Sequence, residues 1–312
     1  MAHPRRFRFG IQLSQPLDGM TWAETAQHVE SLGYSSLQMP DHFGDQLAPL
    51  TALAVAAGAT STLKVGALVF GNDYRHPVTL ATEMATLDVL SSGRVEVGLG
   101  AGWMTTDYEQ SGIPLDPPGV RVDRLEESLQ VVQGLFGGNE FSFAGEHYQL
   151  SGMTLRPHPY TDGGPPLVVG GGGRRVLSIA ARYADIVGIN SNMRAGVIGV
   201  DAAVDALPGA TDRKVDWVRE AAGDRFDDIE LNALAFLAAV CDDAGDRARS
   251  LAEIFGTDAT ELLDSPVVLL GTLDEIEERL LARRERWGFS YYVFSGPVAD
   301  EMAPVVARLT GR

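Results

Sequence analysis

The segment PDHFGD (40–45) places two side chains that could move a proton next to each other, Asp41 and His42. An imidazole titrates near neutral pH, so His42 is suited to general acid–base catalysis. In the alternative interpretation, Asp41 caps a turn and His42 is an ordinary loop histidine. The fold around the segment has to decide between these two hypotheses.

A run of four glycines, from Gly170 to Gly173, precedes two arginines that open a helical pattern, Arg174 and Arg175. Glycine leaves backbone N–H groups uncovered, and N–H groups at a helix N-terminus bind anions. A guanidinium beside them could add a two-pronged contact to a phosphate. We therefore predict a phosphate site here, and the alternative is a flexible loop with solvated arginines. The run is not a dinucleotide-binding GxGxxG motif, because no acidic residue closes a following strand of a βαβ unit.

Three glycines alternate with larger residues in VEVGLGAGW, namely Gly98, Gly100 and Gly102, and Trp103 follows them. Glycine at every second position clears one face of a strand. Such a face could let a flat ring lie against the backbone, or it could allow tight packing inside the protein. Both hypotheses place these glycines at a close approach.

Composition excludes several classes of function. The net charge is −17, from 25 Lys plus Arg against 42 Asp plus Glu, and such a surface repels a nucleic-acid backbone. Cys241 is the only cysteine and the six histidines are scattered, so we expect no disulfide and no metal. No apolar stretch approaches the roughly 20 residues of a spanning helix and no export signal is visible. We therefore expect a cytoplasmic protein without membrane or nucleic-acid contacts.

Short β-type runs alternate with longer helical runs along the chain. Each predicted strand is followed by a helical run, and the eight strands are at 7–13, 35–40, 63–70, 95–102, 166–171, 185–190, 229–240 and 289–296. Eight repeats favour an α/β fold of the (β/α)8 TIM barrel type over a doubly wound sheet, which normally needs fewer units. Active sites of such barrels lie just past the C-terminal ends of the strands, where His42, Trp103 and the glycine run all fall.

Two segments interrupt this rhythm, residues 138–165 after the fourth strand and residues 191–210 after the sixth. We predict that both are insertions in a single barrel domain over residues 1–312. In the first insertion, FSF and HYQL flank the turn-like AGE, and this pattern predicts a small hairpin.

Together, the motifs resemble the luciferase-like monooxygenase superfamily, and within it the branch that uses the deazaflavin coenzyme F420. The resemblance runs almost from end to end. Its segments are PDHF (40–43), RHPV (75–78), TLDVLSSGRVEVGLGAGW (86–103), GEHYQL (145–150), GGGGRR (170–175) and GTLDEIEERL (271–280). The resemblance implies a (β/α)8 barrel whose mouth holds the cofactor ring, with the cofactor phosphate at the glycine run.

Carried over residue by residue, the resemblance implies that Asp41 contacts the deazaflavin. It also implies that His42 lies beside the reacting ring as a proton donor or acceptor, and that a non-proline cis peptide falls within residues 67–70. The expected catalytic residues are His42 and Trp103. The expected cofactor-binding residues are Asp41, Leu68, Val69, Phe70, Gly102, Thr106, Gly171, Gly172, Gly173, Arg174, Arg175 and Val176.

Two positions depart from the F420-dependent sugar-phosphate dehydrogenases, which this chain also resembles. Their catalytic glutamate corresponds to Trp103, and their cofactor-contacting asparagine corresponds to Thr106, a smaller hydroxyl. The resemblance therefore gives no support for glucose 6-phosphate oxidation. Trp103, with Phe43, Tyr74 and Tyr108, predicts a more apolar substrate pocket than a sugar phosphate would require.

The leading hypothesis is an F420-dependent oxidoreductase that moves a hydride between C5 of the deazaflavin and a small organic substrate, with His42 handling the proton. One alternative is an FMN-dependent luciferase-like monooxygenase, which uses reduced flavin and oxygen. Another is a catalytically silent barrel that binds a ligand. The resemblance also implies a homodimer formed through helices beside the early strands.

Overall fold

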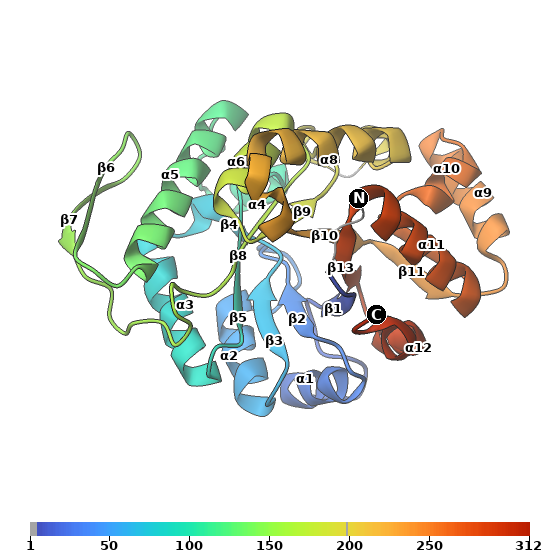
Figure 1. The fold of residues 1–312 in the computed structure, drawn as a ribbon, viewed down its shortest axis with the longest axis horizontal. Helices are drawn as coiled ribbons and strands as arrows, with labels where there is room; N and C mark the ends of the chain where they lie inside the picture. Colours follow the sequence, from blue (N-terminus) through green and yellow to red (C-terminus); the bar gives the residue numbers. More distant parts are fainter. Residues whose placement is uncertain (1–4, 198) are drawn as a thin grey trace.

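A closed barrel of eight parallel strand positions, one of them shared by β3 and β4, is surrounded by helices (Figure 1). The structure is a computed structural model that describes residues 5–197 and 199–312, so Ile198 of the predicted insertion 191–210 lies outside it. The barrel strands are β1 (Arg8–Gln12), β2 (Ser36–Met39), β3 (Lys64–Ala67), β4 (Phe70–Gly71), β5 (Val95–Gly100), β8 (Leu167–Gly171), β9 (Ile186–Ile189), β10 (Glu230–Ala235) and β13 (Phe289–Ser295). Both β3 and β4 pair with β5, so together they occupy one strand position, and the β3–β5 pairing closes the sheet. The predicted (β/α)8 barrel is confirmed.

Helices cover the outside of the barrel and fill the connections between strands. They are α1 (Trp22–Ser31), α2 (Pro49–Ala59), α3 (Pro77–Ser91), α4 (Thr105–Ser111), α5 (Pro118–Phe136), α6 (Arg174–Tyr183), α7 (Val200–Val204), α8 (Pro208–Ala222), α9 (Ala244–Phe255), α10 (Ala259–Asp264), α11 (Leu273–Trp287) and α12 (Ala299–Leu309). The sequence analysis missed α4, α7 and α10, because helices this short show no clear apolar period. Among the helices described, none is long and apolar enough to cross a bilayer.

The third barrel strand is interrupted, whereas the sequence predicted one continuous strand at 63–70. It consists of β3, which ends at Ala67, and β4, which begins at Phe70. The peptide bond between Leu68 and Val69 is cis, inside the range that the resemblance implied. These residues form a wall at the C-terminal end of the barrel.

Close packing against this interrupted strand explains why two of the alternating residues of β5 are glycines. A Cβ on Gly98 would lie 1.9 Å from the carbonyl oxygen of Ala67, and a Cβ on Gly100 would lie 2.6 Å from the side chain of Val69. Neither contact leaves room for a side chain, although Gly100 also lines the cavity at the barrel mouth. Tight packing therefore explains Gly98, whereas Gly100 both packs against Val69 and borders the cavity.

The first predicted insertion, residues 138–165, contains the expected hairpin. Its strands are β6 (Phe141–Ala144) and β7 (Gln149–Met153), which pair in an antiparallel arrangement. The hairpin projects from the barrel beside α5, at the left of Figure 1. It lies away from the C-terminal ends of the strands that carry the predicted site residues.

The second predicted insertion, residues 191–210, is a loop followed by α7 and the start of α8. Lys214 of α8 is 1% exposed and holds both ends of this segment. Its ammonium group donates to the carbonyl oxygen of Asn190 at 2.9 Å and forms an ion pair with Asp205 at 2.5 Å. Burial lowers the pKa of Lys214, and the Asp205 carboxylate opposes this effect.

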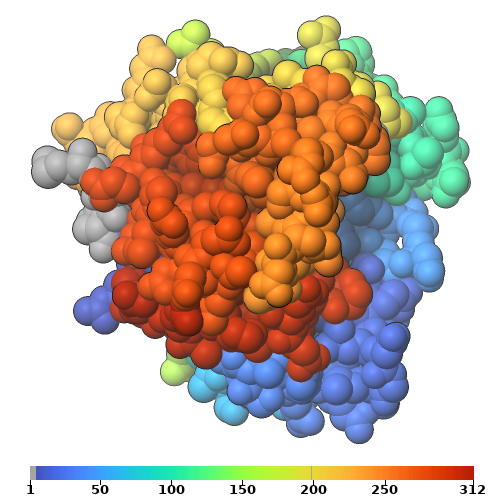
Figure 2. Space-filling model, turned by 90° about the vertical axis from the view of Figure 1, so that its right-hand side faces the viewer, coloured from blue at the N-terminus to red at the C-terminus, as the bar shows by residue number. Residues whose placement is uncertain are grey.

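The predicted strand at 229–240 is wrong as a single strand. The chain leaves the barrel after Ala235, and β11 (Leu237–Val240) pairs in parallel with β12 (Val268–Gly271), which the sequence analysis missed. With α9 and α10 between them, these strands form a satellite unit over residues 237–271 that has a small core of its own. It lies at the right of Figure 1 and forms much of the orange surface in Figure 2. A continuous apolar run does not mark where one sheet ends and the next begins, and the error follows from this.

Candidate active site

A cavity of about 750 Å³ lies at the C-terminal ends of the barrel strands, where barrel enzymes carry their active sites. Of the predicted site residues, all but Thr106 and Arg174 line it. Those that line it are Asp41, His42, Leu68, Val69, Phe70, Gly102, Trp103, Gly171, Gly172, Gly173, Arg175 and Val176. Thr106 is exposed on α4, and Arg174 forms an ion pair with Glu220 at 3.0 Å. A cavity of this volume is typical of a site for a small molecule or cofactor.

His42 is held by a carboxylate that the sequence analysis missed. Its Nδ1 lies 2.6 Å from Oδ2 of Asp107, a 3% exposed residue in the first turn of α4. The same carboxylate accepts the hydroxyl of Tyr74 at 3.1 Å and the backbone N–H of Phe43 at 3.2 Å. An ionised carboxylate only accepts hydrogen bonds, so Nδ1 carries a proton. The other ring nitrogen, Nε2, has no hydrogen-bond partner among the described residues and is left to exchange a proton.

The surroundings of His42 fix its ring without covering it. Burial raises the pKa of the Tyr74 hydroxyl well above its usual range, and the Asp107 carboxylate raises it further, so Tyr74 remains a donor to Asp107. The ring of Trp103 meets the ring of His42 edge to face, with centroids 5.6 Å apart and an interplanar angle of 86°. The His42 side chain is still 26% exposed. This arrangement holds the ring of His42 in one orientation and leaves Nε2 accessible, as a general acid or base requires.

Asp41 connects the loop after β2 to the segment that begins with β4. Its Oδ2 accepts the Nη1 of Arg75 at 2.6 Å and the backbone N–H of Gly71 at 2.8 Å, and its Oδ1 accepts the Nη2 of Arg75 at 3.1 Å. Both oxygens are therefore engaged, although Asp41 lines the cavity. The structure gives Asp41 a positioning role, and its contact with a cofactor stays a prediction.

The glycine run leads into a helix whose N-terminus is free to bind an anion. Helix α6 has Gly173 as its N-cap, with no side-chain cap and no acidic residue in the first turn. A Cβ on Gly173 would meet only the side chain of Asn192, at 3.8 Å, so the space in front of the helix is open. Gly172 differs, because its Cβ would lie 2.3 Å from the backbone of Ser191. Chain packing explains Gly172, whereas Gly173 borders the predicted phosphate site.

Of the two arginines that the sequence suggested, Arg175 lines the cavity and Arg174 does not. Arg175 forms an ion pair with Asp123, and both side chains are about half exposed. Arg121 of α5 is 8% exposed and lines the cavity, and it donates to the backbone carbonyls of Ala101, Gly102 and Asp116 and lies beside the ring of Tyr108. No carboxylate in the described chain forms an ion pair with it. Arg121 is therefore an uncompensated cation in the cavity wall, and such a cation favours an anionic ligand.

The sequence analysis missed Asp107 and Arg121 for different reasons. Asp107 follows Trp103 by four residues, in a short helix with no apolar pattern. Its position just past a barrel strand was the signal that could have found it. Arg121 was expected at the start of a helix over 121–137. That helix begins at Pro118, and Arg121 is the first residue of its buried face.

The cavity suits a phosphorylated, tricyclic cofactor. Residues 68–71 form one wall, and Gly102 adopts a φ of +74° at the rim, where a Cβ would lie 1.9 Å from the hydroxyl of Tyr108. The free N-terminus of α6 and the side chain of Arg121 suit a phosphate. His42 supplies a proton-transfer group in the same cavity. These residues fit both F420 and FMN, which share a tricyclic ring and a 5′-phosphate.

Comparisons with known proteins agree with this arrangement. The model of one family, described as luciferase-like monooxygenase, matches residues 7–291. An FMNH(2)-dependent dimethylsulfone monooxygenase from Pseudomonas putida is 29% identical over 225 residues, which cover 66% of this chain and 61% of that protein. An F420-dependent hydroxymycolic acid dehydrogenase from Mycobacterium tuberculosis is 30% identical over 171 residues, which cover 51% of this chain and 46% of that protein.

A solved structure supports the fold over nearly the whole length. The coenzyme F420 dependent tetrahydromethanopterin reductase from Methanopyrus kandleri superposes with a TM-score of 0.74 at 19% identity, covering 97% of each chain. The similar proteins are oxidoreductases or monooxygenases, and their names place either F420 or FMN among their cofactors. Because the family match spans residues 7–291, the chain belongs to the luciferase-like monooxygenase family.

Proposed function

We propose that this protein is an F420-dependent oxidoreductase that transfers a hydride between the deazaflavin and a small organic substrate. When bound, F420 would supply C5, the carbon that gives or takes the hydride. The chain's own residues would bind the cofactor phosphate, form the wall behind the ring and handle the proton. The free N-terminus of α6 and Arg121 serve the first task, and residues 68–71 serve the second.

The observation that carries the proposal is the pair formed by His42 and Asp107. Moving a hydride to or from a carbon that bears oxygen or nitrogen also requires a proton to be taken or given. Asp107 holds Nδ1 of His42 at 2.6 Å and leaves Nε2 without a partner. His42 can therefore take a proton from the substrate at Nε2 in one direction and return it in the other, while Asp107 stabilises the charged ring.

An equilibrium titration of the purified protein with F420, and separately with FMN, tests the cofactor assignment. Binding is followed by the change in cofactor fluorescence, so no substrate is needed. We expect F420 to bind more tightly than FMN. The reverse order would overturn the proposal, and binding of neither cofactor would favour a catalytically silent barrel.

The second candidate is an FMN-dependent monooxygenase, because the similarity to the Pseudomonas putida enzyme extends over 66% of this chain. The same cavity residues would then bind reduced FMN. Oxygen consumption that depends on reduced FMN and a partner reductase would support this candidate.

A further inference from the structure

Asn190, Asn192 and Arg194 line the cavity just before α7, and after them in the chain its lining comes from apolar residues of α7, the end of β10 and the satellite unit. We call this apolar part of the cavity the apolar arm, and its residues are Gly199, Ala202, Ala203, Ala206, Leu234, Phe236, Leu237, Leu251, Phe255, Leu262, Val267 and Val268. The other part of the same cavity holds His42, Arg121 and the glycine run. One cavity therefore combines a polar half, where the chemistry is proposed, with an apolar half.

Only Leu234, at the end of β10, comes from a barrel strand. Helix α7 contributes Ala202 and Ala203, and Ala206 follows it. Most of the larger side chains come from the satellite unit, through β11, α9, α10 and β12. Phe236 and Leu237, at the junction of β10 and β11, remain 46% and 38% exposed. Large apolar side chains that stay exposed beside a cavity gain free energy when a ligand covers them.

We propose that the apolar arm binds an unbranched hydrocarbon chain of the substrate, whose reacting carbon lies near His42. This inference rests on the proposed function for the location of the reacting end. The cofactor is a poor occupant of the arm, because a phosphate or carboxylate there would lose its water without gaining a donor. A hydrocarbon chain needs no donor and gains by leaving water.

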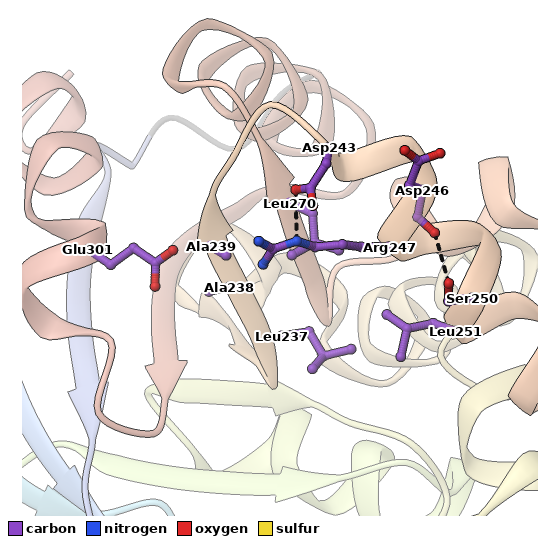
Figure 3. A pocket seen from close by; sticks show the side chains of 10 residues that line it. All are labelled: Leu237, Ala238, Ala239, Asp243, Asp246, Arg247, Ser250, Leu251, Leu270 and Glu301. Atoms are coloured by element: carbon purple, nitrogen blue, oxygen red, sulfur yellow. Dashed lines mark hydrogen bonds and ion pairs between the residues drawn. The ribbon is translucent and has the colours of Figure 1, made fainter.

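The far end of the arm defines the length of chain that it can hold. A second, more open cavity of about 630 Å³ lies beyond it, and Leu237 and Leu251 line both cavities. In Figure 3 these two side chains lie on one side of the second cavity, and the Asp243–Arg247 ion pair lies on the other. Leu237 and Leu251 thus separate the arm from a charged surface, and we expect the gain per carbon to stop where the chain reaches them.

The test is the affinity of the cofactor-free protein for straight-chain secondary alcohols from 2-butanol to 2-decanol, measured by calorimetric titration. While the chain fits the arm, each added CH₂ should tighten binding about fourfold, and longer chains should gain nothing more. Affinity that does not change with chain length would overturn the proposal.

Two substitutions sharpen this test because they act in opposite directions. Ala203→Phe fills the arm and should weaken binding of the longer alcohols at least tenfold, while 2-butanol is unaffected. Phe255→Ala enlarges the arm and should move the length limit to longer chains. Val204→Phe is the matched control, because Val204 is on the same helix, is 46% exposed and does not line the cavity. If all three variants keep the wild-type chain-length profile, the arm is not the binding site.

A parallel titration with F420 keeps this proposal separate from the cofactor assignment. The Ala203→Phe and Phe255→Ala variants should bind F420 as the wild type does, because both substitutions leave the glycine run, Arg121 and His42 unchanged. A wild-type protein that fails to bind F420 but shows the chain-length profile supports the arm and overturns only the cofactor assignment. A wild-type protein that binds F420 but whose affinity for alcohols does not depend on chain length overturns the proposal for the apolar arm.

Discussion

The two ends of the barrel are both rich in charged side chains but use them differently. At the N-terminal end, Glu30 accepts the backbone N–H groups of residues 61–63, and Arg94 donates to carbonyl oxygens from both neighbouring connections. At the C-terminal end, Nε2 of His42 and the first turn of α6 face the cavity without partners in the described chain. Where hydrogen-bonding capacity is used up, it holds the fold together. Where it is left over beside a cavity, it is available to a ligand.

In the barrel interior, as at the N-terminal end, the charged side chains bond to partners within the chain. Arg8 bonds to Glu96 at 2.7 Å and to Glu230 at 2.6 Å, and Glu96 also accepts the hydroxyl of Tyr291 at 3.1 Å. Arg8 holds the pKa of the fully buried Glu96 below its usual value, although burial alone would raise it. These charges compensate one another, so none of them is left free for a ligand.

The largest expected effect is on turnover and comes from removing Nε2 of His42 at the C-terminal end of the barrel. His42→Asn should lower turnover by about 10² or more and change F420 affinity by no more than a few fold, because only the proton transfer is lost. The matched control is His28→Asn, since His28 forms a pair with Asp300 at 2.8 Å far from the cavity. Steady-state kinetics on both variants measure the difference. Equal losses in the two variants would contradict the role of His42.

A smaller effect is expected from Asp107, which acts through His42. Asp107→Asn should lower kcat roughly tenfold with little change in KM, because the ring loses its orientation but keeps its nitrogen. In the His42→Asn background the same substitution should cost almost nothing more. A full tenfold loss in that background would show that Asp107 acts independently of His42. The double-mutant cycle therefore separates a positioning role from a general structural one.

The N-terminus of α6 gives a third test, in which charge and space are separated. Gly173→Asp should cap the helix and leave stability nearly unchanged, yet weaken cofactor binding about tenfold, because its carboxylate repels the phosphate. Gly173→Asn has the same shape without the charge, so its loss of affinity should be smaller. Fluorescence titration measures both. Equal affinities for the Asp and Asn variants would show that no anion binds at this helix.

The smallest effect is expected at the N-terminal end and should appear in stability alone. Backbone and side-chain donors of residues 61–63 lower the pKa of Glu30 to about 2, against the opposing effect of burial. A lowered pKa stabilises the fold fully above pH 4.5, and the contribution is lost as the pH falls from there toward 2. Glu30→Gln should therefore cost about 1 kcal/mol at pH 7, after allowance for screening by water, and less at pH 3.

Urea denaturation at the two pH values measures this difference, with the exposed Glu253→Gln as the control. Turnover of the Glu30→Gln variant should equal that of the wild type. A loss of turnover would remove the distinction between the two ends of the barrel. A destabilisation that is the same at both pH values would show that the carboxylate charge of Glu30 does not matter.

The sequence predicted the barrel well because the signal repeats. Eight apolar runs alternate with helical runs, and each run is a local pattern that needs no partner to be recognised. The hairpin of residues 138–165 was also predicted, because a turn between two β-type runs is local. The satellite unit was not predicted. The run over 229–240 belongs to two sheets, and the partner of β11 lies about thirty residues further along the chain.

The sequence by itself determined the barrel, the position of the cavity at the strand ends and most of the residues that line it. These follow from local patterns and from the rule that parallel strands bring their C-terminal ends together. Only the tertiary structure decided which side chains are engaged and which are free. Asp41 is bound to Arg75 and Arg175 to Asp123, whereas His42 and Arg121 keep capacity for a ligand. A hydrogen bond or an ion pair depends on distances across the fold, and spacing along the chain does not encode them.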